Sequence, residues 1–97
     1  MEKVFYLNEL YDLYESLLTI KQQKYFKDYY FHNLSYGEIA IKYGISRNAI
    51  YHQLKLIEEK LKSYEENLKL YSKKQKINDI MNMIEEEKIK KELERLF

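Results

Sequence analysis

The sequence has no cysteine, no proline and no tryptophan, and it has only two glycines in 97 residues. Without cysteine the chain forms neither disulfides nor a cysteine-containing zinc site. Without proline, and with glycine only at Gly37 and Gly44, it lacks the usual turn residues of hairpins and multi-turn sheets. These absences favour one small all-α domain that is stabilised by apolar burial alone.

Long apolar runs and a strong net charge of one sign are also missing. No apolar run approaches the ~18 residues of a membrane span, and the N-terminus is charged from Glu2 onward. We therefore expect a cytoplasmic protein with no membrane partner. The net charge is only +1, which argues against a strongly basic nucleic-acid binder, but residues 35–56 hold three basic side chains and one acidic one.

Apolar periodicity predicts two helices in the first third of the chain. Over about 3–18, side chains at three- and four-residue spacing form one stripe: Leu7, Leu10, Tyr11, Tyr14, Leu17 and Leu18. Thr19 and Gln22 fit a capping box, so a second helix is expected to begin there and to end near His32 and Asn33.

A helix-turn-helix is predicted next. Ser35 and Glu38 form a second capping box, ahead of the candidate core residues Ile39, Ala40 and Tyr43. Gly44 suits the left-handed position just past a helix end. Ile45 then fills the corner and Ser46 caps the following helix, so that about three residues join the two helices.

From Ser46 onward a heptad seam predicts a long helix with an apolar face. Its members are Ile50, Leu54, Ile57, Leu61, Tyr64, Leu68 and Tyr71. Ser72 and Gln75 allow a further helix to begin at Lys73, or the long helix runs on without a break. A second stripe follows at Ile77, Ile80 and Ile84, then at Ile89, Leu93 and Leu96 after a change of face.

We divide the chain into a helical bundle at 1–56, with the helix-turn-helix at 35–56, and a helical extension at 57–97. The extension is expected to form a homodimer through Ile57, Leu61, Tyr64, Leu68, Tyr71, Ile77, Ile80 and Ile84. The alternative is that the tail folds back on the first helix as an intramolecular hairpin.

Catalytic machinery is scarce in the sequence. There is no cysteine nucleophile, and neither His32 nor His52 is expected to have a carboxylate partner. The two glycines belong to no phosphate-binding loop, and the run Glu85–Glu87 cannot converge on one ion because neighbouring helical side chains diverge. We expect no enzyme, no metal and no cofactor.

A nucleic-acid-reading face is predicted at the start of the long helix. Ala49, Ile50 and Leu54 turn toward the core, which exposes Arg47, Asn48, Tyr51, His52 and Lys55. In a major groove, Arg donates twice to guanine and Asn pairs with adenine. Lys42, Arg47 and Lys55 are candidate phosphate contacts, joined by Lys21, Lys24 or Lys27 if the second helix faces the backbone. The alternative is an ordinary helix junction with polar surface residues.

The stretches Leu34–Ala40 and Tyr43–Tyr51 resemble the fourth region of bacterial sigma factors, and the chain from Leu10 through Lys55 with its charged tail is similar to the YlxM family. The resemblance implies a sigma-region-4-like helix-turn-helix bundle with a long recognition helix and a C-terminal helix. It matches Ser46 to the helix cap and Arg47 to the basic residue after it, and it places Tyr51, His52 and Lys55 toward the groove.

The resemblance also implies a part in the signal recognition particle pathway. Two positions depart from the family pattern, because Leu56 replaces a basic residue and His52 replaces an acid. The leading hypothesis is a DNA-binding regulatory homodimer. The alternative is a protein or RNA adaptor that docks on a signal recognition particle component without sequence-specific DNA binding.

Overall fold

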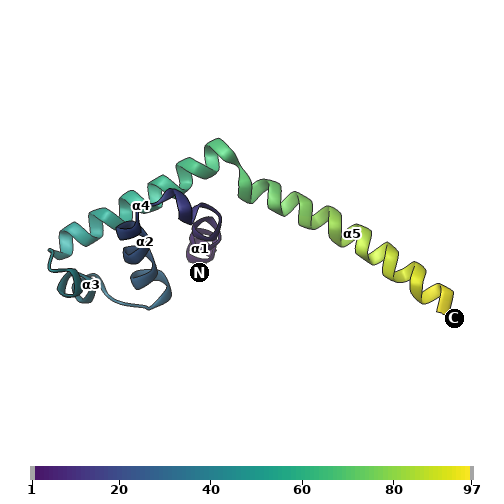
Figure 1. Cartoon of the computed structure of the whole chain (residues 1–97), viewed down its shortest axis with the longest axis horizontal. Helices are drawn as coiled ribbons and strands as arrows, with labels where there is room; N and C mark the ends of the chain where they lie inside the picture. The colour runs from purple at the N-terminus through teal and green to yellow at the C-terminus, as the bar shows by residue number, and fades with distance from the viewer. Residues whose placement is uncertain (1, 97) are drawn as a thin grey trace.

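The computed structural model describes residues 2–96 as a succession of helices (Figure 1). These are α1 (Glu2–Tyr14), the 3₁₀ turn η1 (Glu15–Leu17), α2 (Ile20–Phe26), the π-helical turn η2 (Lys27–Phe31), α3 (Tyr36–Tyr43), α4 (Arg47–Leu68) and α5 (Leu70–Leu96). No strand occurs within this described range. The all-α class and the predicted helix-turn-helix bundle, with a long recognition helix and a C-terminal helix, are confirmed.

The helix starts coincide with the capping residues that the sequence indicates. The Thr19 hydroxyl accepts from the Gln22 N–H at 3.1 Å, and the Gln22 side chain accepts from the Thr19 N–H at 3.0 Å. Ser35 and Glu38 form the same reciprocal pair at the start of α3. Each pair satisfies two of the backbone donors that a helix N-terminus leaves free, so these boundaries are encoded locally.

The core lies where α4 crosses α1, α2 and α3. The Tyr11 ring stacks on Phe26 at 4.3 Å between centroids, which joins α1 to α2. The buried apolar side chains are Leu7, Leu10, Tyr11, Tyr14, Leu18, Tyr25, Phe26, Ile39, Ala40, Ile50, Leu54, Ile57 and Leu61. The first four positions of the heptad seam are therefore covered by helices of the same chain.

This packing corrects the predicted dimer surface. Ile57 and Leu61 have 0 % of their surface exposed, so they offer nothing to a second chain. Tyr64 is also engaged within the chain, since its hydroxyl donates to the Leu17 carbonyl at 3.2 Å. Tyr71 packs edge-on against Tyr6 at 5.2 Å. Of the predicted dimer residues, Leu68 and the three isoleucines of α5 keep large exposed areas.

A corner separates α4 from α5 at Lys69, which has a left-handed backbone (φ +55°). It falls four residues before the predicted start at Lys73, and the helix does not run on unbroken. The Tyr14 hydroxyl accepts from the Leu70 N–H at 3.0 Å, and Glu65 accepts from the N–H groups of Tyr71 and Ser72 at 2.8 and 3.3 Å. Tyr14 also donates to Glu65 at 2.7 Å. The corner is thus capped by side chains from α1 and α4 rather than by Ser72.

Helix α5 extends away from the bundle as an isolated arm, and the molecule measures 65 Å along its longest axis (Figure 1). Beyond Ser72 every described side chain of α5 is exposed. The tail therefore does not fold back on α1 as a hairpin. The compact bundle reaches the corner at Lys69 instead of ending at residue 56, because α4 passes through that position without interruption.

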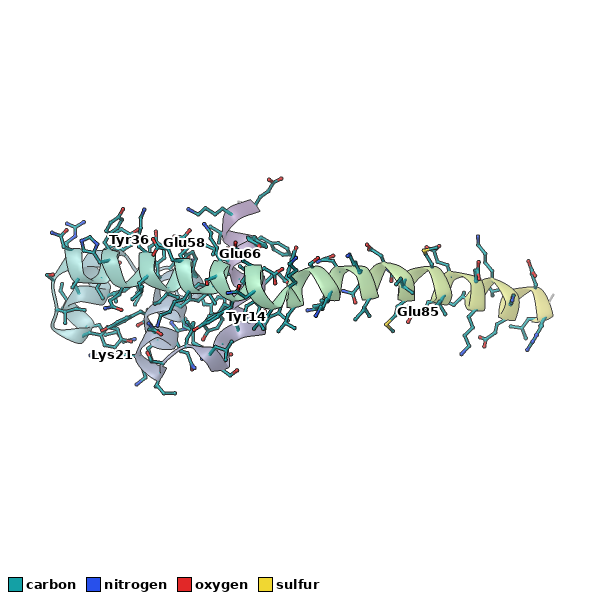
Figure 2. The ribbon with its side chains drawn as sticks, turned by 90° about the horizontal axis from the view of Figure 1, so that it is seen from above. Tyr14, Lys21, Tyr36, Glu58, Glu66 and Glu85 are labelled. Carbon is teal, nitrogen blue, oxygen red and sulfur yellow. The ribbon has the colours of Figure 1, made fainter. Side chains whose placement is uncertain are left out.

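The corner provides a stability prediction. We expect Glu65→Ala to lower the free energy of unfolding by about 1–2 kcal/mol, because the first turn of α5 loses a cap that accepts two N–H groups. The melting temperature is expected to fall by roughly 4–15 °C, measured by circular dichroism. The matched control is Glu66→Ala, next along α4 (Figure 2), where the side chain is exposed. Equal effects of the two variants would contradict the capping role.

Candidate nucleic-acid interface

The turn between α3 and α4 sets the position of the candidate reading face. Gly44 is left-handed (φ +68°), and the Ile45 N–H donates to the Ala40 carbonyl at 3.0 Å, which closes the end of α3. An added Cβ at Gly44 would meet nothing within 4 Å, so its backbone conformation alone explains the glycine. Ile45 packs against the core, and Ser46 accepts from the Ala49 N–H at 3.1 Å. The turn is therefore fixed by packing and caps together.

The start of α4 divides into two faces as the sequence predicts. Ile50 and Leu54 are buried and Ala49 is partly buried. Five polar or aromatic side chains on the other face are exposed: Arg47, Asn48, Tyr51, His52 and Lys55. Their exposure makes them available to a groove, and the contact itself stays a prediction.

Tyrosines surround this face, and the sequence reasoning missed one of them. Tyr36 of α3 lies with Arg47, Asn48 and Tyr51 around one shallow hollow. The rings of Tyr36 and Tyr51 meet edge-on at 5.8 Å, and Tyr36 also stacks on Tyr29 at 5.0 Å. Figure 2 shows Tyr36 in the bundle, at the end of the molecule away from α5. No local sequence pattern indicates that Tyr36 belongs to this face, because only the packing of α3 on α4 brings it beside Arg47.

The Tyr36 hydroxyl remains protonated at physiological pH. A hydrogen bond with Tyr29 and then burial raise the pKa of Tyr36 to about 12. Beside it, the Lys55 ammonium lies 5.8 Å from the centroid of the Tyr51 ring. The face therefore presents the Tyr36 phenol, the Tyr51 ring and cations, a combination suited to phosphates and bases.

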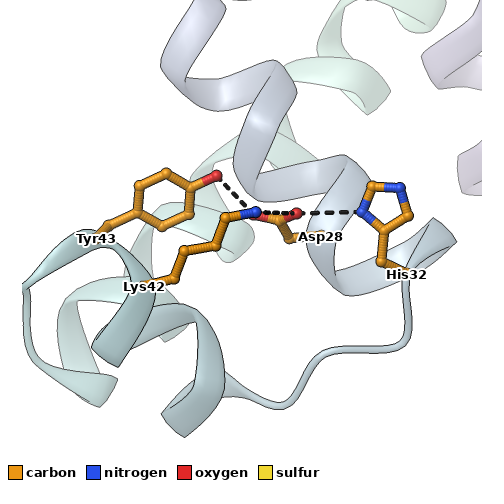
Figure 3. A network of polar contacts seen from close by, with 4 residues as sticks. All are labelled: Asp28, His32, Lys42 and Tyr43. Atoms are coloured by element: carbon orange, nitrogen blue, oxygen red, sulfur yellow. Dashed lines mark hydrogen bonds and ion pairs between the residues drawn. The ribbon is translucent and has the colours of Figure 1, made fainter.

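Lys42, a predicted phosphate contact, is already paired within the chain. Its ammonium donates to both carboxylate oxygens of Asp28, at 3.0 and 3.1 Å, and Tyr43 donates to the same carboxylate at 2.6 Å (Figure 3). Asp28 belongs to η2, so these bonds tie η2 to α3. Lys42 is thus part of an ion pair within the bundle, although its side chain stays half exposed.

The expectation that His32 has no carboxylate partner is wrong. Its Nδ1 lies 3.2 Å from Asp28, one turn earlier in the π-helical segment (Figure 3). Burial by itself would raise the pKa of the Asp28 carboxyl, but the hydrogen bonds from Tyr43, Lys42 and His32 outweigh burial and hold that pKa below its ordinary value. All three partners engage the carboxylate at once, which indicates a structural role.

The lysines of α2 and η2 separate into two groups. Lys24 and Lys27 lie with Lys42 and His32 around the hollow above Asp28. Lys21 lies with Ala49 and Gln53, beside the first turns of α4. Lys21 is therefore the lysine of α2 nearest to the reading face, and the other two flank the Asp28 network.

Two features are absent from the described part of the chain. Residues 2–96 contain no group of three or more histidine or acidic side chains arranged to hold a metal ion. Within the same range, no helix has the length and hydropathy required to cross a bilayer.

Comparison with known proteins agrees with this geometry. Residues 1–96 match the UPF0122 family, described as "Putative helix-turn-helix protein, YlxM / p13 like". A UPF0122 protein of Geobacillus sp. (strain WCH70) is 42% identical over 86 residues, covering 89% of this chain and 78% of the relative. UPF0122 proteins of Anoxybacillus flavithermus and Halalkalibacterium halodurans are 48% and 45% identical over 58 residues, covering 60% of this chain and 53% of each relative.

The Asp28 network provides a prediction with a defined pH dependence. We expect Asp28→Asn to lower the free energy of unfolding at pH 7 by about 1–3 kcal/mol, because a buried charged acceptor that binds three side chains is lost. The folded-state pKa of Asp28 is depressed. Its contribution is therefore full above the unfolded pKa of about 3.9, and it is lost as the pH falls through the lower folded pKa.

The measurement is denaturant unfolding of both proteins between pH 7 and pH 2. The wild-type advantage is expected to shrink below about pH 4. Asp79→Asn, at an exposed position of α5, is the control and should leave stability unchanged. A difference that persists undiminished at low pH would mean that the carboxylate charge contributes nothing.

Proposed function

Because the chain belongs to the UPF0122 family of YlxM / p13-like helix-turn-helix proteins, we propose that it is a cytoplasmic DNA-binding regulatory protein that acts as a homodimer. Its role is binding rather than catalysis, and the family resemblance connects it with the signal recognition particle pathway. The proposed DNA-contacting residues are Ser46, Arg47, Asn48, Tyr51, His52 and Lys55, with Lys42 as a flanking contact.

One observation carries the proposal: the first three turns of α4 expose Arg47, Asn48, Tyr51, His52 and Lys55 together, while the opposite face is held in the core. A recognition helix needs this division, because its N-terminal side chains must reach base edges while the bundle anchors it. The N-terminus of α4 is capped by the Ser46 hydroxyl, which carries no negative charge that would repel a phosphate.

The charge of the unit limits its affinity. Arg47 and Lys55 lie on the reading face and Lys21 lies beside it, which allows about three phosphate contacts per chain and a slope of log K against log[salt] near −3. Lys42 adds less than a free lysine, because Asp28 already neutralises it. Two chains on one duplex would double the slope.

The test is a double substitution on the reading face. Arg47→Ala with Lys55→Ala is expected to abolish the gel shift of any duplex that the wild type retards, because two cations and the guanine-reading group are lost. Lys90→Ala with Arg95→Ala removes the same two residue types from α5 and should leave the shift intact. Circular dichroism checks that both variants fold.

Unchanged retardation by the Arg47/Lys55 variant would contradict the proposed interface. The salt dependence gives a second reading of the same experiment. For Arg47→Ala or Lys55→Ala alone, the fitted slope should fall by about 1 in magnitude if the removed cation contacts one phosphate.

The second candidate is a protein or RNA adaptor that docks on a signal recognition particle component. The observation in its favour is the small number of cations on the reading face, Arg47 and Lys55, of a chain whose net charge is only +1. Affinity purification from a bacterial lysate separates the two candidates. Enrichment of the particle's GTPase or RNA without DNA would favour the adaptor, and enrichment of DNA fragments would favour the regulator.

A further inference from the structure

Beyond Ser72, no other element of the described chain covers the arm α5. Four neighbouring apolar side chains on it, Ile77, Ile80, Met81 and Ile84, are each between 50% and 58% exposed. At 3.6 residues per turn they form one stripe. Solvent exposure of a continuous apolar stripe on a helix with no packing partner indicates an interaction surface.

The charges beside this stripe change sign along the helix. Lys74 and Glu85 lie on one flank, and Lys76 and Glu87 lie on the other, as the helical repeat places them. The N-terminal half of the stripe is thus flanked by cations and the C-terminal half by anions. A partner that matches this surface has the same apolar length and the reverse order of charges.

A second copy of the same helix has these properties when it runs in the opposite direction. We propose that α5 pairs antiparallel with α5 of a second chain about a two-fold axis between Ile80 and Met81. Ile80 then lies beside the second chain's Met81, and Ile77 lies beside its Ile84. The stripe is self-complementary, as a symmetric dimer interface must be.

The flanking charges select the antiparallel orientation. In this pairing Lys74 faces Glu85 of the second chain, and Lys76 faces its Glu87, on the same flank and offset by about 3 Å along the axis. A parallel pairing places lysines beside lysines and glutamates beside glutamates, which is unfavourable. Only Lys73 and Lys88, at the ends of the stripe, bring like charges together in the antiparallel arrangement.

Because the apolar stripe is short, the affinity of the proposed α5 dimer is low. Four apolar side chains per helix bury less surface than the roughly 1,200 Å² of a stable complex, so the dimer is reversible and depends on concentration. The inference deepens the proposed homodimer by naming its surface. It is tested without nucleic acid, so its failure and the failure of DNA binding are separate results.

Cysteine cross-linking tests the orientation directly, because the natural chain has no cysteine. Ile77→Cys and Ile84→Cys variants of the full chain are mixed and oxidised. The mixture should form a disulfide-linked product of twice the chain mass. Ile77→Cys alone should not, because its two copies lie about 10 Å apart along the axis in the antiparallel pair.

The control is Met83→Cys, at an exposed position on another face of α5. It should not cross-link above background under the same conditions. Efficient linkage of Ile77→Cys to itself would overturn the antiparallel arrangement in favour of a parallel one. Absence of linkage in the mixture, with the mass of one chain by light scattering at all concentrations, would overturn the pairing altogether.

Charge reversal gives an independent test that avoids cysteine. Lys74→Glu with Lys76→Glu should raise the dimer Kd by at least about tenfold, because each pair becomes Glu against Glu. Adding Glu85→Lys and Glu87→Lys in the same chain should restore the wild-type Kd, measured by sedimentation equilibrium. A quadruple variant as weak as the double one would contradict the pairing.

Discussion

Burial of one face of α4 is the interaction on which the rest of the molecule depends. Ile50, Leu54, Ile57 and Leu61 lie along a single ridge, and α1, α2 and α3 cover it from the same side. The opposite side of the first turns of α4 therefore faces solvent, and the Arg47 and Asn48 side chains are exposed there. The ridge also fixes how far the bundle reaches, because α1 covers α4 as far as the corner at Lys69, where the Tyr14 hydroxyl meets the Leu70 N–H.

Much of the fold is encoded locally and is accessible from the sequence. Ser and Thr followed by Glu or Gln mark helix starts, and Gly44 marks a helix end, because each satisfies backbone groups within a few residues. The reading face follows from the same reasoning, since the buried positions of α4 identify the exposed ones. The assignment of YlxM-like family membership is confirmed by the match over residues 1–96.

Features that depend on distant contacts could not be predicted. A heptad seam shows that a face is apolar but not which surface covers it. The seam alone therefore predicts a second chain beside Ile57 and Leu61, where helices of the same chain pack. Lys69 gives no sign of a corner, because its left-handed backbone is stabilised by Tyr14, 55 positions earlier in the chain. Asp28 likewise has partners from α3 that only the folded chain brings to it.

The corner has a mechanical consequence. The hydroxyl of Tyr14, in the last turn of α1, holds the first N–H of α5 while the same residue's ring is buried in the core. The first turn of α5 is thereby attached to α1. Because α5 is 27 residues long, a small rotation of α1 moves the far end of α5 much further than its first turn. The direction of the arm is therefore set by the orientation of α1 in the bundle.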